Sequence, residues 1–311
     1  MRNFIGHKTV ISNFKKRIEL GEISHAHIIV GEDGIGKSNL SKILAENILG
    51  KDESKSYIDI INYKCKKTSI GIDDVREIVS EVNRKPFEGD KKVIIIYSGN
   101  KMTVQAQNAL LKTIEEPPSG IYIMLLCESL EFVLDTIKSR CQIHKLTPLT
   151  KEEIQLYVHN ILEGDYNQDE IKAAISYSGG IPGKVETFLM DSSLKELRDL
   201  LINLLYVIIS GNIKNILDFE EKILSYKNEK EEVINVLSSF IRDIMIYKEL
   251  DDVDEIINGD KIEDIKKLAI EMSYKKLNKI IDNIGEARRV LLSNSNFQLT
   301  IRVMLIGFME V

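Results

Sequence analysis

Glycines, a lysine and a serine between positions 31 and 38 have the residue types and the spacing for phosphate chemistry. They match the pattern G-x-x-x-x-G-K-[ST], in which the glycines let backbone N–H groups surround a phosphate without side-chain clashes. Lys37 supplies a positive charge for the β- and γ-phosphates, and the Ser38 hydroxyl is placed to ligate Mg²⁺. We therefore predict a site for ATP or ADP, with Mg²⁺ when nucleotide is bound, formed by Gly31, Gly34, Gly36, Lys37 and Ser38.

The flanking sequence contains the elements that such a loop needs. An apolar run at residues 28–30 predicts a strand before the loop, and the apolar positions of residues 39–49 predict a helix after it. The positive N-terminal end of that helix adds to the attraction for phosphate. The alternative is a glycine-rich turn from strand to helix without a ligand, which the complete spacing in this context disfavours.

Strands and helices alternate up to about residue 148, which is typical of a doubly wound parallel sheet. The runs at 93–97 and 121–127 are apolar throughout, as expected of strands that are buried on both faces. Pro117 cannot continue a helix, so the helix predicted before it ends near that position. Strands are expected at 57–61, 93–97 and 121–127, and helices at 8–20, 72–82 and 104–115.

Beyond residue 148 the pattern becomes helical, and no convincing strand is seen. Capping-box patterns at 150–153 and 167–170 precede helices with apolar periodicity. The last stretch, 297–311, is apolar nearly all round, which predicts a helix that is buried in a bundle or in an assembly. The expected domains are an α/β nucleotide-binding domain at 1–148, a small three-helix lid at 149–191 and an all-α domain at 192–311.

Composition limits the partners and the compartment. The 311 residues carry a net charge of −6, which disfavours a chain that binds nucleic acid by itself, because such binding needs a basic face. Cys65, Cys127 and Cys141 lack C-x-x-C spacing and indicate reduced thiols in a cytoplasmic protein without a zinc site. His25 and His27 are conceivable ligands of one metal, but no third ligand is near, so structural roles are favoured. No segment resembles a signal peptide or a membrane span.

A P-loop enzyme that hydrolyses its nucleotide also needs a carboxylate after a neighbouring buried strand, to hold Mg²⁺ or to polarise water. At the end of the strand at 93–97 stand Tyr97 and Ser98, and neither residue can perform that role. Glu128 follows the strand at 121–127 and is the fallback carboxylate. The sequence therefore favours nucleotide binding without hydrolysis and leaves Glu128 as the alternative.

Two longer motifs carry a resemblance to a known family. Residues 108–118 read N-A-L-L-K-T-I-E-E-P-P, which resembles the N-A-L-L-K-T-L-E-E-P-P signature of clamp-loader subunits within the AAA+ superfamily. The segment 139–141 resembles their S-R-C motif, and residues 25–38 and 293–299 fit the same alignment. The resemblance covers most of residues 1–150, and the helical remainder is similar to the lid and C-terminal domain of that family.

The resemblance implies that this chain and the motor subunits have different roles in ATP hydrolysis. Motor subunits of the family carry Asp-Glu at the places of Tyr97 and Ser98, so this chain is expected to hold any nucleotide as a static ligand. Arg140 would act as an arginine finger in trans, on the ATP of an adjacent motor subunit, and the alternative is a buried ion pair inside its own domain. Lys184 lies where lid domains of the family can contact nucleotide. Many bacterial relatives carry a four-cysteine zinc module after the P-loop helix, and with only Cys65 in that region this chain lacks it.

The leading hypothesis is a non-hydrolysing scaffold of the bacterial DNA polymerase III clamp loader. It would work with motor subunits of the tau/gamma type and a delta subunit, and through them with the sliding clamp and primer-template DNA. Its helices at 192–311 would form one segment of a ring-shaped collar. A second hypothesis is an autonomous AAA+ ATPase motor that uses Glu128 or another carboxylate. A third, a small-molecule P-loop kinase, is disfavoured by the long helical C-terminal half.

Overall fold

The computed structural model describes residues 4–51, 57–65, 67–211, 213–251, 253, 255–293 and 295–309. The chain divides into two compact units. The first consists of Met1–Glu163 with Gly180–Gly183, and the second consists of Gly164–Gly179 with Lys184–Val311. The division into three domains with borders after residues 148 and 191 stays a prediction.

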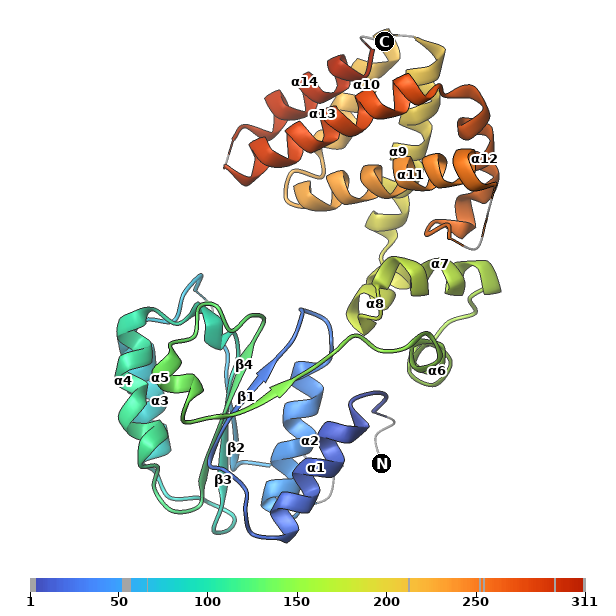
Figure 1. Cartoon of the computed structure of the whole chain (residues 1–311). Coiled ribbons are helices and arrows are strands. Elements are labelled where there is room, and N and C mark those ends of the chain that lie inside the picture. Colours follow the sequence, from blue (N-terminus) through green and yellow to red (C-terminus); the bar gives the residue numbers. More distant parts are fainter. Residues whose placement is uncertain are drawn as a thin grey trace. The chain divides into compact units, whose positions relative to one another are not determined.

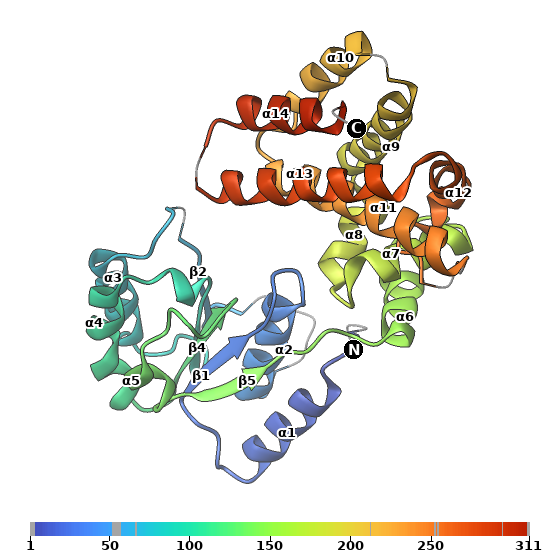
Figure 2. The same cartoon turned by 45° about the horizontal axis from the view of Figure 1, so that its top comes forward.

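The first unit contains a sheet of five strands. These are β1 (Ala26–Val30), β2 (Ile60–Tyr63), β3 (Lys92–Ile96), β4 (Ile121–Cys127) and β5 (Gln142–Lys145). All neighbours are parallel, in the order β2-β3-β4-β1-β5 (Figures 1 and 2). In register, Val30 lies opposite Cys127 on one side and Lys145 on the other, so the carboxyl end of β1 lies inside the sheet.

Helices cover both faces of this sheet. They are α1 (Lys8–Glu19), α2 (Lys37–Leu49), α3 (Ile72–Val82), α4 (Val104–Glu115) and α5 (Asp135–Lys138), with a 3-10 turn η1 (Gly99–Lys101). A further helix of the first unit, α6 (Lys151–Ile161), follows β5 in the sequence. α1 and α2 lie on one face, and α3, α4 and α5 lie on the other (Figure 1). Successive residues of β3 point to opposite faces, so Ile94 belongs to the core under α3 and α4 while Ile95 belongs to the core under α1 and α2.

The predicted doubly wound α/β fold is confirmed, and so are β3, β4, α3 and α4. The strand expected at 57–61 begins only at Ile60, because Asp59 is fully buried and accepts hydrogen bonds from the backbone N–H groups of Phe87 and Glu88, at 2.7 Å each. β5 is not predicted from the sequence, since three of the four residues of this edge strand are polar. A continuous apolar run indicates a buried strand, and an edge strand does not need one.

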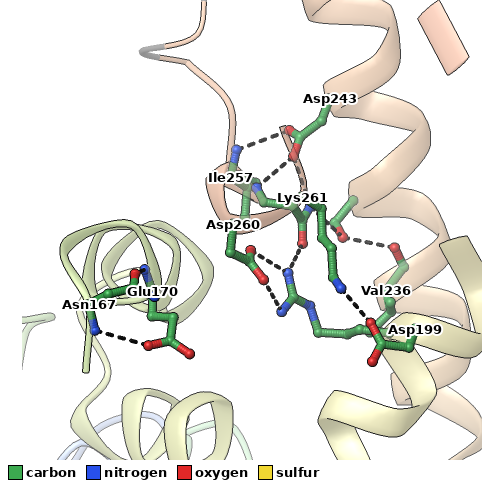
Figure 3. Close-up of polar contacts among 11 residues, drawn as sticks. Asn167, Glu170, Asp199, Val236, Asp243, Ile257, Asp260 and Lys261 are labelled. Atoms are coloured by element: carbon green, nitrogen blue, oxygen red, sulfur yellow. Dashed lines mark hydrogen bonds and ion pairs between the residues drawn. The ribbon is translucent and has the colours of Figure 1, made fainter. Parts of the chain in front are cut away.

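The second unit is helical, and within the described residues no strand follows Lys145. Its helices are α7 (Gln168–Ser178), α9 (Ser192–Ser210), α10 (Ile213–Leu224), α11 (Lys230–Leu250), α12 (Ile262–Glu271), α13 (Tyr274–Leu292) and α14 (Phe297–Met309), with a 3-10 turn η2 (Gly259–Lys261). A further helix, α8 (Pro182–Met190), begins in the first unit and continues in the second. Both predicted capping boxes form, and Figure 3 shows that of Asn167 and Glu170. None of the helices in the described ranges is long and apolar enough to span a membrane.

A buried polar network fixes the segment before α12 against α9 and α11 (Figure 3). The Arg198 guanidinium of α9 donates to both carboxylate oxygens of Asp260 at 2.8 Å and to Asn258 at 3.0 Å. Asp243 of α11 is fully buried, and its carboxylate accepts the backbone N–H groups of Ile257 and Asn258 at 3.1 and 2.8 Å. Because the carboxylates of Asp243 and Asp260 each accept at least two hydrogen bonds here, residues of α9 and α11 hold the segment before α12 in place.

The last helix has two different faces. Ile301, Met304, Leu305 and Phe308 are buried, as expected, but Leu299, Val303 and Ile306 are between 54% and 61% exposed. The helix is therefore buried in the bundle on one face, and burial of its other face in an assembly stays a prediction. The predicted end of this helix, at residues 310–311, lies outside the described residues.

Candidate phosphate site and arginine finger

The phosphate loop leaves β1 at the carboxyl edge of the sheet. The Gly31 N–H donates to the Cys127 carbonyl at 3.1 Å, and this hydrogen bond ties the start of the loop to β4. Gly34 and Gly36 have φ values of +80° and +103°, a left-handed backbone that other residues adopt only with strain. α2 begins directly after Gly36, so its free N–H groups lie at the loop. Gly34 and Gly36, two of the three glycines predicted from the spacing, therefore have a backbone that can turn its N–H groups toward a phosphate.

Lys37 turns inward and closes the loop. Its Nζ donates to the carbonyls of Gly31 at 2.7 Å and Glu32 at 2.9 Å, and it lies 4.0 Å from an Asp33 oxygen. Burial lowers the pKa of Lys37, while the nearby carboxylates of Asp33 and Glu128 act in the opposite direction. A phosphate would replace loop carbonyls as the partner of this ammonium group, so the residues present fit a nucleotide phosphate. The Ser38 side chain is exposed, as a group that meets a metal ion must be.

The loop also contacts residues that are far away in the sequence. The Gly183 N–H donates to the Gly34 carbonyl at 2.9 Å. A Cβ at Gly183 would lie 2.7 Å from the Gly34 Cα, so the two main chains touch with no room for a side chain. Sequence reasoning did not find this contact. Its only signal in the sequence is the glycine pair at 179–180, followed by Gly183 at the start of a helix.

At the end of β3, an aromatic and polar cluster stands where a motor would need acids. The Tyr97 hydroxyl donates to the Asn62 Oδ1 at 3.0 Å, and the Lys64 ammonium lies 4.6 Å from the centre of the Tyr97 ring. Burial raises the pKa of Tyr97, so its hydroxyl stays protonated at neutral pH. Ser98 has φ +55°, which is uncommon for a residue other than glycine. None of these groups can ligate Mg²⁺ as a carboxylate does or act as a general base at neutral pH.

Glu128, the fallback carboxylate, directly follows β4. Its side chain is exposed, and its backbone N–H donates to the Asn100 Oδ1 at 3.1 Å. β4, and not β3, is the strand next to β1, and Cys127 lies opposite Val30 in register. Glu128 is therefore the carboxylate that follows the neighbouring strand, and its charge acts to raise the pKa of Lys37.

Arg140 follows α5 and lies away from the phosphate loop in the sequence and in its contacts. Its Nε is 2.6 Å from the Glu115 Oε1, and its Nη1 donates to the Thr136 carbonyl at 3.0 Å and to the Ser139 hydroxyl at 3.2 Å. The alternative interpretation, an ion pair inside its own domain, is correct for the pairing, but the pair is not buried. The side chains of Arg140 and Glu115 are 41% and 42% exposed.

His27 has a structural environment. It is fully buried on β1, where its Nδ1 lies 3.1 Å from the Nε2 of His144 on β5, and the Phe14 ring packs against both imidazoles. Burial, with the neighbouring His144, lowers the pKa of His27 to about 3, and burial lowers that of His144 to about 4. Throughout the ranges that the structure describes, no three His, Cys, Asp or Glu side chains are grouped to hold a metal. Cys65, Cys127 and Cys141 are free thiols.

Two family models match this chain. The model described as DNA polymerase III, delta subunit, matches residues 6–150, and the model described as DNA polymerase III, delta subunit, C terminal, matches residues 192–310. The chain belongs to the DNA polymerase III delta-subunit family. The segments that carried the resemblance to clamp-loader subunits, 108–118 and 139–141, lie inside the first match.

Curated relatives give the same result. The chain is 25% identical over 299 residues to the DNA polymerase III subunit delta' of Bacillus subtilis, a match that covers 90% of this chain and 89% of that protein. It is 27% identical over 228 residues to the delta' subunit of Escherichia coli, covering 73% of this chain and 65% of that protein. A DNA polymerase III subunit gamma of Buchnera aphidicola is 26% identical over 203 residues, and there the chain spans about half of the relative's length. The loss of both acids at Tyr97 and Ser98 predicts the delta-prime type among clamp-loader subunits, and this recognition is confirmed.

A solved structure supports the fold. The crystal structure of a DNA polymerase III gamma subunit-related protein from Thermotoga maritima matches with a TM-score of 0.52 and 19% identity, over 96% of this chain and 98% of that one. At this identity the likeness shows the fold, a parallel α/β part followed by helices, which agrees with the predicted fold class.

Proposed function

We propose that this chain is a non-hydrolysing, delta-prime-type clamp-loader subunit of DNA polymerase III, which supplies Arg140 in trans to the ATP site of an adjacent motor subunit. One observation carries the proposal. An exposed guanidinium lies in a unit whose strand β3 ends in Tyr97 and Ser98 and not in a carboxylate. Such a unit can stabilise transition-state charge on another chain's γ-phosphate, while the end of β3 at its own site carries no group that can activate water.

A nucleotide fits this function as a static ligand. Gly31, Gly34, Gly36, Lys37 and Ser38 would hold the phosphates of ATP or ADP, with Ser38 contacting Mg²⁺. The bound metal would neutralise phosphate charge and help to order the loop. In the absence of an acid at Tyr97 or Ser98, bound ATP would persist.

The partners follow from the family. We infer that the chain assembles with motor subunits of the tau/gamma type and a delta subunit, and acts with them on the sliding clamp and primer-template DNA. The exposed apolar residues Leu299, Val303 and Ile306 support assembly through the helices of 192–311, because an apolar helix face in contact with water favours association. The negative net charge of −6 agrees with DNA contact through the complex and not by this chain alone.

The proposal is tested by the clamp- and DNA-stimulated ATPase of a reconstituted loader. Arg140→Ala should lower turnover at the adjacent motor site roughly 10³-fold, because an arginine finger contributes about that much. Lys37→Ala should leave turnover nearly unchanged. Arg76→Ala is the matched control, since Arg76 is also exposed, also lies in the first unit and pairs with Asp73 at 2.8 Å.

The competing function is an autonomous AAA+ motor. Glu128 favours it, because this carboxylate acts on the pKa of Lys37 from beside the phosphate loop. In that case the isolated chain turns over ATP, and Lys37→Ala or Glu128→Gln abolishes the turnover. Failure of the isolated chain to hydrolyse ATP that it binds excludes the motor and supports the scaffold.

A further inference from the structure

Two segments that both resemble clamp-loader motifs meet through one ion pair. Glu115 belongs to the E-E-P-P segment at the end of α4, and Arg140 belongs to the S-R-C segment after α5. They are 25 positions apart in the sequence, yet the Arg140 Nε and the Glu115 Oε1 are only 2.6 Å apart. From the sequence alone, the E-E-P-P segment indicates a helix terminus, because Pro117 cannot continue the helix before it.

Glu115 lies at a place where a carboxylate is locally unfavourable. It is the last residue of α4, and the partial negative charge of a helix C-terminus disfavours an acidic side chain there. Pro117 prevents the helix from continuing, so the carboxylate stays at the helix end. A residue that contradicts a local preference without an evident structural gain is a candidate for a functional role.

The pair contributes little to the stability of the fold. Both side chains are about two-fifths exposed, and exposed ion pairs typically contribute between 0 and about 1 kcal/mol. The effect of the pair is to orient the Arg140 guanidinium. Glu115 holds the guanidinium at Nε, and the Thr136 carbonyl and Ser139 hydroxyl hold Nη1 from the side of α5. The planar guanidinium is thereby fixed in orientation while two-fifths of the Arg140 side chain remains open to solvent.

We propose that Glu115 is the positioning residue for Arg140, an exposed carboxylate that keeps the guanidinium oriented until the γ-phosphate of a neighbouring subunit's ATP takes part in binding it. This inference rests on the proposed trans role of Arg140. Carboxylate and phosphate oxygens are both recognised by the same guanidinium N–H groups, so the exchange of one for the other needs no new donor geometry. Because an exposed ion pair contributes little free energy, replacing the Glu115 carboxylate by the phosphate costs little. The rate of ATP hydrolysis rises because Arg140 is already oriented before it meets the phosphate.

The first test uses the full-length chain alone. Modification of Arg140 by phenylglyoxal, followed by peptide mass spectrometry, should be several-fold faster in Glu115→Gln than in the unmodified protein. Glu116→Gln is the matched control, since Glu116 is the neighbouring carboxylate at the same helix end, and it should not change the rate. Arg76 serves as the internal reference within each sample. Equal rates of Arg140 modification in all three proteins would overturn the proposal.

The second test uses the reconstituted loader. Glu115→Gln should lower kcat for ATP roughly tenfold with KM for ATP unchanged, because a misoriented finger affects the transition state and not ground-state binding. Glu115→Asp should restore part of the rate, and Glu116→Gln should have no effect. In an Arg140→Ala background, Glu115→Gln should have no further effect, whereas a merely structural role would add its own loss.

The outcomes separate the two proposals. If Arg140→Ala leaves the loader's ATPase unchanged, the trans role itself fails. If Arg140→Ala lowers the ATPase and Glu115→Gln does not, the trans role stands and the positioning role of Glu115 fails. Thermal unfolding of Glu115→Gln is expected to be within a few degrees of that of the unmodified chain, which makes a folding defect distinguishable from a loss of positioning.

Discussion

The phosphate loop and the Arg140 segment belong to one unit, but they present their positive charges in opposite ways. The Lys37 side chain is 10% exposed and donates to carbonyls of its own loop, whereas the Arg140 side chain is 41% exposed and pairs with an equally exposed carboxylate. The first charge serves a ligand that enters the loop. The second is available to a molecule outside the chain. Under the proposed function, nucleotide binding and catalytic assistance would therefore be separate, and a variant should affect one without the other.

The largest expected effect comes from a substitution of Arg140 that keeps its positive charge. Arg140→Lys should lower single-turnover ATP hydrolysis at the adjacent motor site by roughly 10²-fold or more, because lysine lacks the planar fork of N–H donors. Rapid quenching of the reconstituted loader with labelled ATP measures this rate, and Arg76→Lys is the control. A rate equal to that of the unmodified loader would mean that charge alone is sufficient.

Acid should destabilise the phosphate loop and the Arg140 segment together. His27 on β1 and His144 on β5 join the strand before the phosphate loop to the strand after Arg140. Burial lowers the pKa of His27 to about 3, below its ordinary value near 6.5, so below pH 6.5 the unfolded chain binds a proton that the folded chain does not. His27 therefore costs little stability above about pH 6.5. Below that pH, its contribution makes the free energy of unfolding fall as the pH falls. From pH 7 to pH 5 the loss from His27 alone is about 2 kcal/mol.

Urea unfolding at the two pH values measures this loss. His27→Phe, which removes the titrating group, should reduce the difference between the two pH values. His159→Asn should leave it unchanged, since His159 is exposed. Identical pH dependence in His27→Phe and the unmodified chain would contradict the assignment.

Gly183→Ala sharpens the comparison, because it affects the phosphate loop and leaves Arg140 untouched. The added Cβ would lie 2.7 Å from the Gly34 Cα, so main chain must shift, at a cost of about 1–3 kcal/mol. Nucleotide affinity measured by isothermal titration should fall, while stimulation of the loader ATPase through Arg140 should persist. Gly89→Ala is the control, because nothing lies within 4 Å of a Cβ at Gly89.

The smallest expected effect on the isolated chain comes from the exposed face of α14. Val303→Lys should change the free energy of unfolding by less than about 0.5 kcal/mol, since Val303 is 58% exposed. The same change should weaken assembly with the other loader subunits, as measured by sedimentation. Gln298→Lys, also exposed on α14, is the matched control. Assembly that is unaffected by Val303→Lys would exclude this face as an interface.

The sequence predicts best what local physics determines. β3 and β4 are continuous apolar runs, and the Thr150 and Asn167 capping boxes are complete within four residues, so their positions follow from short windows. β5 is an edge strand with polar residues, and its place beside β1 depends on the whole sheet. The exposed stripe of α14 has the same composition as its buried face, so periodicity does not separate them.

The candidate site also has one part that could be predicted from the sequence and one part that could not. The spacing of residues 31–38 is a local pattern, and the loop has the expected left-handed glycines at Gly34 and Gly36. The partner of Arg140 could not be predicted, because Glu115 comes close only when α4 and α5 pack on the same face of the sheet. The E-E-P-P and S-R-C motifs single out both segments, but only the structure shows that the two segments are in contact.

The junction of Gly34 and Gly183 has one more consequence. It joins main chain to main chain, since the Gly34 carbonyl accepts the Gly183 N–H at 2.9 Å, and it leaves little room for a Cβ at either glycine. The Ile181 side chain also packs against Gly34, and both Ile181 and Ile35 are buried. A deep mutational scan of the chain should therefore show positions 34 and 183 intolerant of any side chain, whereas positions 35 and 181 should accept apolar side chains of similar size.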